Sequence, residues 1–116
     1  MRLLIVDDNR RMRRFLHSLV QDLVSESCEA ENGIDAVEKY AQFHPDAVLM
    51  DIRMPFMDGL EATRRILAGD AGARVVIVTD FDTPEYRAQA STAGARGYLS
   101  KDELFDLHGM LEELEA

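Results

Sequence analysis

Short apolar runs alternate with longer segments of helical periodicity along the 116-residue chain. Three runs, LLIV at residues 3–6, AVLM at 47–50 and VVIV at 75–78, have no polar residue and predict strands that are buried on both faces. A shorter strand is expected at GYL, residues 97–99, and a polar one at SCEAE, residues 27–31. The polarity of SCEAE is typical of a strand at the edge of a sheet.

Helical spacing of apolar residues fills the segments between and after these strands. Pro45 follows the second such segment and stops it, whereas Pro84 begins the fourth, because proline is tolerated only in the first turn of a helix. The five predicted helices cover residues 9–24, 36–41, 59–67, 84–93 and 104–114.

Strands without polar alternation, separated by helices, predict a parallel sheet that is covered by helices on both faces. Right-handed crossovers then give a three-layer, doubly wound α/β sandwich of five strand–helix units, (βα)5. A flavodoxin-like strand order, 2-1-3-4-5, is one of the two common outcomes. The chain contains no repeat or linker, so residues 1–116 are expected to form a single domain.

Charge and composition narrow the classes of function. The net charge of −9 argues against a domain that grips nucleic acid by itself. No apolar run approaches the ~20 residues of a membrane span, and the N-terminus lacks the long apolar stretch of a signal peptide. The single cysteine, Cys28, rules out an internal disulfide. A cytoplasmic protein without membrane contact is therefore expected.

Polar side chains follow the ends of four predicted strands. Asp7 and Asp8 follow LLIV, Asp51 follows AVLM, Thr79 follows VVIV, and Lys101 follows GYLS. Taken singly, each residue has an ordinary explanation as a helix cap, a turn former, a β-former or a solvated charge. Because the carboxyl ends of parallel strands lie at one edge of the sheet, where such folds bind ligands, the set predicts a site.

Three carboxylates in one pocket repel each other unless a cation lies between them. Mg²⁺ suits this position because it prefers oxygen ligands, uses one or two carboxylates and keeps waters that a phosphate can replace. A carboxylate can itself accept a phosphoryl group. Lys101 and Thr79 would then hold the phosphoryl oxygens, one by charge and one by a hydrogen bond.

The segments LLIVDDN, VLMDIRMPFMDG, VVIVTD and GARGYLSKD resemble the receiver domain of two-component response regulators, and the resemblance covers essentially the whole chain. It implies that Asp51 takes a phosphoryl group from a phosphohistidine of a sensor histidine kinase. It further implies that Asp8 binds Mg²⁺ directly, that Asp7 binds it through water, and that the backbone carbonyl of Arg53 is a third protein ligand.

The same resemblance assigns the remaining roles. Thr79 and Lys101 would hold the phosphoryl oxygens, and Tyr98 would be the aromatic switch that turns inward when Thr79 is drawn to the phosphoryl group. The surface of the fourth helix, fifth strand and fifth helix would then change its partners. Such a domain assists its own phosphorylation and dephosphorylation but turns over no external substrate, so it is not expected to be an enzyme in the usual sense.

Two longer segments, IRMPFMDGLEATRRI and TDFDTPEYRAQASTAGARGYLSKD, are similar to receivers of LuxR/NarL-type transcriptional regulators. This likeness implies control of transcription through a C-terminal helix-turn-helix domain that this chain does not contain. DNA would be contacted only through that absent domain. A phosphorylation-dependent homodimer is a further expectation.

Two other functions share part of this pattern. A haloacid-dehalogenase-like phosphatase also uses a strand-end Asp, Thr and Lys, but it needs an acid two residues after the nucleophile, where this chain has Arg53. A degenerate receiver that serves only as an interaction module would lack some of the acids, Thr79 or Lys101. Asp80 stands where a small residue is usual in receivers, and we expect it to alter the rate of dephosphorylation.

Overall fold

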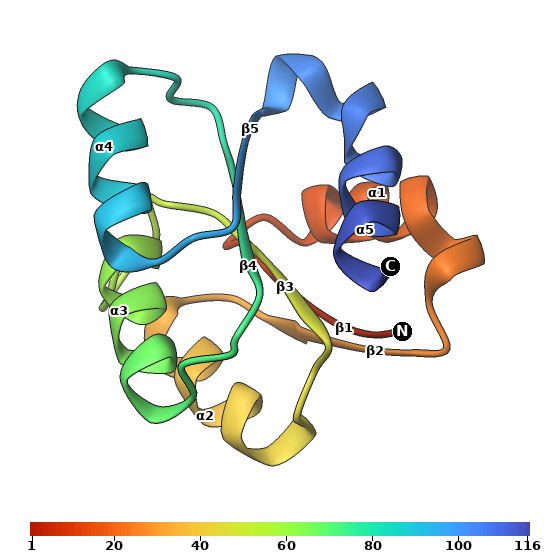
Figure 1. Cartoon of the computed structure of the whole chain (residues 1–116), viewed down its shortest axis with the longest axis horizontal. Helices are drawn as coiled ribbons and strands as arrows, with labels where there is room; N and C mark the ends of the chain where they lie inside the picture. Colours follow the sequence, from red (N-terminus) through yellow and green to blue (C-terminus); the bar gives the residue numbers. More distant parts are fainter.

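The computed structural model describes residues 1–116 and has the predicted five-stranded parallel sheet (Figure 1). Its order is β2-β1-β3-β4-β5, which is the flavodoxin-like order expected from the sequence. The strands are β1 (Arg2–Val6), β2 (Glu26–Ala30), β3 (Ala47–Met50), β4 (Val75–Thr79) and β5 (Gly97–Ser100).

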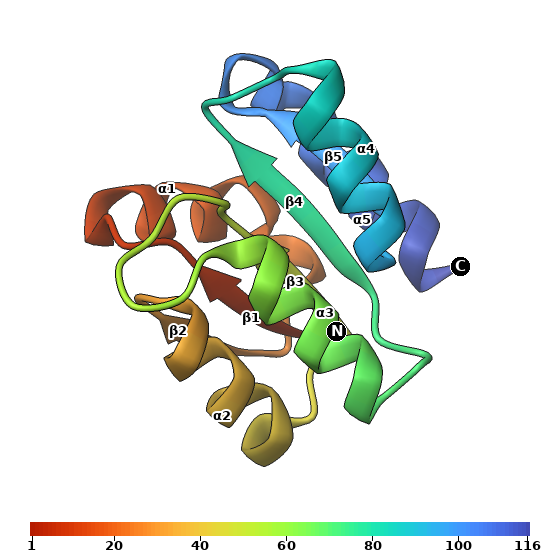
Figure 2. The same ribbon diagram turned by 90° about the vertical axis from the view of Figure 1, so that its left-hand side faces the viewer.

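Five α-helices form the two outer layers. They are α1 (Arg10–Val20), α2 (Gly33–Phe43), α3 (Gly59–Gly69), α4 (Pro84–Ala93) and α5 (Leu107–Glu115). In Figure 1, α1 and α5 lie on one face of the sheet and α2, α3 and α4 on the other, and in the turned view of Figure 2 the layer of α2, α3 and α4 faces the viewer. The predicted three-layer sandwich is therefore confirmed.

Successive residues of each central strand enter opposite halves of the core, because side chains of a strand alternate between its two faces. Leu4, for example, packs in the cluster under α2, α3 and α4, whereas Leu3 and Ile5 pack under α1 and α5. Both clusters are apolar, and this explains why the runs LLIV, AVLM and VVIV of the central strands contain no polar residue.

Side-chain caps fix where four helices begin. Asn9, Asn32, Asp58 and Thr83 each accept a hydrogen bond from the backbone N–H three residues later. Such caps satisfy backbone donors that the helix leaves free. Because β1 ends three residues before the Asn9 cap and β3 ends eight residues before the Asp58 cap, the loops at the carboxyl edge of the sheet begin and end at fixed points.

Several predicted boundaries were wrong, and the second helix, predicted at residues 36–41, extends over Gly33–Phe43. The last helix begins at Leu107, because Lys101–Asp106 form a 3-10 helix in which Glu103 is non-helical (φ −124°, ψ 33°). Leu104 still packs against the core from this 3-10 segment. Its spacing of three residues from Leu107 is that of a helix, and this explains why the sequence predicted one. The first helix likewise ends at Val20 and continues as a 3-10 turn, Gln21–Leu23, and β2 begins and ends one residue earlier than predicted.

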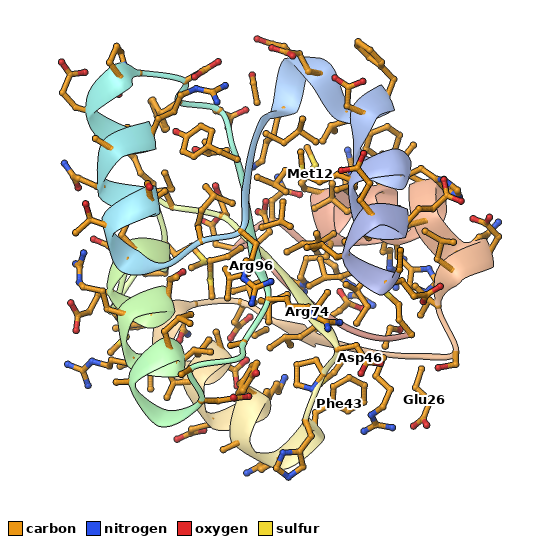
Figure 3. All side chains as sticks on the ribbon, in the orientation of Figure 1. Met12, Glu26, Phe43, Asp46, Arg74 and Arg96 are labelled. Atoms are coloured by element: carbon orange, nitrogen blue, oxygen red, sulfur yellow. The ribbon has the colours of Figure 1, made fainter.

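The amino edge of the sheet is held together by Arg2. Its backbone N–H donates to Asp46, its guanidinium donates to Glu26 at 2.7 Å and stacks on the Phe43 ring at 4.1 Å. Figure 3 shows these three partners gathered at one corner of the molecule.

None of the helices has both the length and the apolar character that crossing a membrane requires.

Candidate functional site

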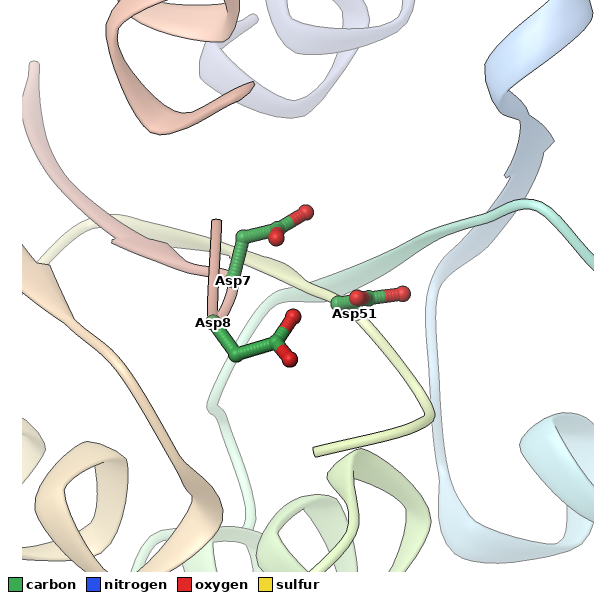
Figure 4. Close-up of side chains that lie close together, drawn as sticks. All are labelled: Asp7, Asp8 and Asp51. Atoms are coloured by element: carbon green, nitrogen blue, oxygen red, sulfur yellow. The ribbon is translucent and has the colours of Figure 1, made fainter. Parts of the chain in front are cut away.

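Three carboxylates meet at the carboxyl edge of the sheet (Figure 4). Asp7 and Asp8 follow β1 and Asp51 follows β3, and the last residues of these two neighbouring strands, Val6 and Met50, pair directly. One carboxylate oxygen from each Asp lies within 4.8 Å of the others. Asp7 and Asp51 are buried, with 1% and 7% of their surfaces exposed, whereas Asp8 is exposed.

Backbone hydrogen bonds fix the two buried carboxylates. The Asp51 N–H donates to the Val6 carbonyl at 2.9 Å, and Asp51 Oδ1 accepts from the N–H of Ile52 at 2.9 Å. Asp7 Oδ1 accepts from the N–H of Asn9 at 2.8 Å. Each carboxylate therefore has one oxygen held by the protein, and the other oxygen is left for the pocket.

Gly59 allows the loop after β3 to fold tightly over the site. Its N–H donates to the Ile52 carbonyl at 2.7 Å. A Cβ at this position would lie 1.7 Å from the carbonyl oxygen of Asp51. Only glycine permits so close an approach of backbone to backbone, and the start of α3 thus sets the position of Asp51.

Lys101 is the cation of the pocket, and its side chain is only 9% exposed. Its Nζ lies 2.9 Å from Asp7 Oδ2, 3.5 Å from Asp51 Oδ2 and 3.7 Å from Asp80 Oδ2. Burial lowers the pKa of Lys101, but the contact with Asp7 and the charges around it outweigh burial, so the pKa lies above its usual value. The side chain stays charged near neutral pH.

The pKa of Asp51 is raised from its ordinary 3.8 to about 6. Burial is the main cause and the charge of Asp7 is the second, while Lys101 and the N–H of Ile52 act in the opposite direction. One ammonium group therefore does not offset the burial of Asp51 together with the charge of Asp7. A second cation near Asp51 would favour its charged form.

The residues present fit a magnesium ion. Asp7 Oδ2 is buried and accepts no hydrogen bond of good geometry, and its one ion-pair partner is Lys101. One oxygen from each of the three carboxylates lies within 4.8 Å of the others, and an oxygen-only set of this kind is what Mg²⁺ prefers. No protein group donates to the carbonyl of Arg53, which leaves that oxygen available as well.

Thr79 and Tyr98 share a partner in the loop after β4. Thr79 is fully buried, and its Oγ1 accepts from the N–H of Phe81 at 3.1 Å. The hydroxyl of Tyr98 donates to the Phe81 carbonyl, and its half-buried ring packs against the core cluster on the side of α4. Arg87 lies over the same ring at 4.7 Å. Phe81 thus links the two residues that the sequence assigned to the switch.

Comparison with known proteins identifies the family. The family model of the response regulator receiver domain matches residues 3–112. The chain belongs to the receiver domain family. It is 44% identical over 98 residues to the chemotaxis protein CheY of Halobacterium salinarum, and the match covers 84% of this chain and 82% of that protein.

The receiver is also 40% identical over 116 residues to CheY of Listeria monocytogenes, with 99% of this chain and 96% of that protein covered. Among solved structures, a LuxR-family DNA-binding response regulator from Staphylococcus aureus has a TM-score of 0.89 at 27% identity and covers 99% of this chain and 98% of its own. The resemblance to receivers of LuxR-type regulators is therefore confirmed. Receivers of this family are signalling switches that interact with histidine kinases and bind Mg²⁺ at an acidic pocket.

The receiver brings most of the predicted residues together. Asp7, Asp51 and Lys101 are in contact, and Asp8 completes the acidic cluster. Thr79 lies at the end of a neighbouring strand but is bonded to Phe81 and not to a carboxylate.

Sequence reasoning missed two contacts at this edge. Asp80 reaches Lys101, and the Arg53 guanidinium stacks on the Phe81 ring at 4.0 Å. The available signal was position: Asp80 directly follows the strand-end Thr79, and Arg53 and Phe81 each stand two residues beyond a strand-end site residue.

Proposed function

We propose that this receiver accepts a phosphoryl group on Asp51 from a phosphohistidine of a sensor histidine kinase. The observation that carries this proposal is a buried carboxylate with a lysine ammonium 3.5 Å away and two further acids beside it. A purely structural ion pair would not need three acids around one lysine.

In the forward step an Asp51 carboxylate oxygen attacks phosphorus and the bond from phosphorus to the histidine nitrogen breaks. The Lys101 ammonium lies beside the attacking carboxylate and would neutralise a phosphoryl oxygen. Asp7, Asp8, Asp51 and the carbonyl of Arg53 would hold Mg²⁺, which supplies further charge for the phosphoryl oxygens when it is bound.

The phosphoryl group would also draw the Thr79 hydroxyl toward it. Since Thr79 Oγ1 accepts from the Phe81 N–H and Tyr98 donates to the Phe81 carbonyl, a movement of Thr79 would reach Tyr98 through one residue. The surface formed by α4, β5 and α5 would then change its partners, and a phosphorylation-dependent homodimer is one such partner. Hydrolysis of the aspartyl phosphate resets the switch without turnover of an external substrate.

The nature of the output has two candidates. Control of transcription through an attached helix-turn-helix domain is favoured by the similarity to a LuxR-family DNA-binding response regulator. Direct binding of a partner protein, in the manner of a chemotaxis switch, is favoured by CheY relatives that match over 82% and 96% of their own lengths. Both outputs would depend on the same phosphorylated Asp51.

The proposal is tested by intact mass after incubation with Mg²⁺ and acetyl phosphate, beside an Asp51→Asn variant and a sample with chelated metal. One phosphoryl adduct on the wild type and none in either control is the expected result. A phosphorylated histidine kinase is used as donor in parallel, because small donors are poor substrates for some receivers. Absence of an adduct with both donors would refute phosphoacceptance and leave an interaction module, and turnover of a generic phosphate ester would support the phosphatase alternative.

A further inference from the structure

The side chain of Arg53 joins the loop that carries Asp51 to the loop after β4. Its guanidinium carbon lies 4.0 Å from the centre of the Phe81 ring, and its Nε donates to the Tyr86 hydroxyl at 3.3 Å. The rings of Phe81 and Tyr86 are themselves in contact, with their centres 6.2 Å apart. We call Arg53, Phe81 and Tyr86 the aromatic clamp.

The backbone N–H, the carbonyl and the ring of Phe81 each contact a different part of the switch. Its N–H bonds to Thr79, its carbonyl accepts from Tyr98, and its ring is held by Arg53. The position of one residue therefore depends on the strand end beside the site, on β5 and on the phosphoacceptor loop at the same time.

Arg53 is held by neutral groups only. No carboxylate lies within ion-pair distance of its guanidinium, whereas Arg87 pairs with Asp82 and Arg13 pairs with Glu29. A cation over an aromatic face is attracted by the negative potential of the ring. The Arg53 side chain is therefore held between two loops by an aromatic ring and a hydroxyl group.

We propose that Arg53 is a positioning residue that couples the state of Asp51 to α4 through the aromatic clamp. Tyr86 stands in the first turn of α4, and its backbone N–H donates to the capping side chain of Thr83. Movement of the phosphoacceptor loop would thus reach the start of α4 through Arg53, beside the route through Thr79. The inference rests on the proposed phosphoacceptor function for its signalling consequence, whereas the clamp itself is a property of the unphosphorylated protein.

The clamp is tested first without any phosphoryl group, by hydrogen exchange of the backbone amides of Phe81 and Tyr86. Arg53→Gln and Phe81→Leu should each raise the exchange rates roughly two- to fivefold, the range expected for loss of an exposed cation–π contact. The double variant should exchange no faster than the single variants, because both remove the same contact. Arg74→Gln is the matched control, since Arg74 is exposed, makes no ion pair and lies at the opposite end of β4 (labelled in Figure 3).

Coupling is tested by following backbone amide resonances while beryllofluoride, a phosphoryl mimic, is added with Mg²⁺. In the wild type, changes should reach from the residues around Asp51 to α4. In Phe81→Leu, the changes around Asp51 should persist while those in α4 fall by half or more. Arg53→Lys, which keeps the charge but loses the planar group, should give an intermediate result.

The outcomes separate the two proposals. Additive or absent effects on exchange would overturn the clamp, and full changes in α4 of the Phe81→Leu variant would overturn the coupling. If beryllofluoride and Mg²⁺ leave the wild type unchanged around Asp51, phosphoacceptance fails and the coupling role fails with it. The exchange measurement still decides in that case whether Arg53 holds the loop.

Discussion

Replacing Asp51 by Asn should stabilise the receiver at pH 7.5, although it removes the residue on which the proposed function depends. The fold raises the pKa of this carboxyl from 3.8 to about 6. At about 1.4 kcal/mol per pKa unit, such a rise corresponds to roughly 3 kcal/mol. Part of the carboxylate keeps contact with solvent at the edge of the sheet, so we expect about 2 kcal/mol.

The sign of the effect follows from proton linkage. Because the folded state binds the proton of Asp51 more tightly than the unfolded state does, the charged carboxylate opposes folding above pH 6. This cost disappears as the pH falls from about 6 to about 4, where Asp51 becomes protonated in the folded protein. Asn carries no charge at any pH, so the difference between the two proteins should shrink over the same interval.

Urea denaturation from pH 4 to pH 8 measures this difference. Asp106→Asn, a change of an exposed acid in the segment before α5, is the control for a general change in net charge. A second series with Mg²⁺ should stabilise the wild type and leave Asp51→Asn nearly unchanged, since a ligand stabilises only the state that binds it. Equal stability of wild type and Asp51→Asn at pH 7.5 without metal would refute the reasoning.

Three further perturbations test the site. Gly59→Ala should lower stability by about 1–3 kcal/mol in thermal denaturation, because its Cβ would lie 1.7 Å from a backbone oxygen and the backbone would have to shift. Gly69→Ala, at the other end of the same helix, has open space around its Cβ and should be neutral or mildly stabilising in the same measurement. Asp80→Ala should change the decay of the phosphorylated protein followed by intact mass, because Asp80 contacts Lys101, and equal decay would contradict this role. Lys101→Met should lower stability in urea titrations at pH 7 by about 1–3 kcal/mol, because Asp7 Oδ2 is left without its ion-pair partner. Addition of Mg²⁺ should restore most of this loss.

The parts of the fold that the sequence predicted well are those where one physical effect dominates. Runs such as LLIV and VVIV have no polar residue, so only a position buried on both faces suits them. The assembly of Asp7, Asp51 and Lys101 followed from the same prediction, because parallel strands end at one edge. No side-chain geometry was needed to bring these residues together.

The parts that were not predicted depend on contacts between loops. Leu104 in the 3-10 helix Lys101–Asp106 and Leu107 in α5 have a spacing that also suits one continuous α-helix. The non-helical backbone of Glu103, which interrupts such a helix, has no signal in this spacing. Arg53 could have pointed into solvent, and its stacking on Phe81 depends on how two loops from different strands approach each other. Periodicity carries no information about such an approach.

The pairing of β1 with β3 makes the geometry of the site independent of the surfaces that bind partners. The carboxylates of Asp7 and Asp51 stand one residue beyond the paired residues Val6 and Met50, so their separation is set by the spacing of a β-ladder, about 4.8 Å between strands. That spacing does not depend on the outward faces of the surrounding helices. Exchanging those faces can therefore give the same phosphorylation chemistry a different partner, with the carboxylates left at their original separation.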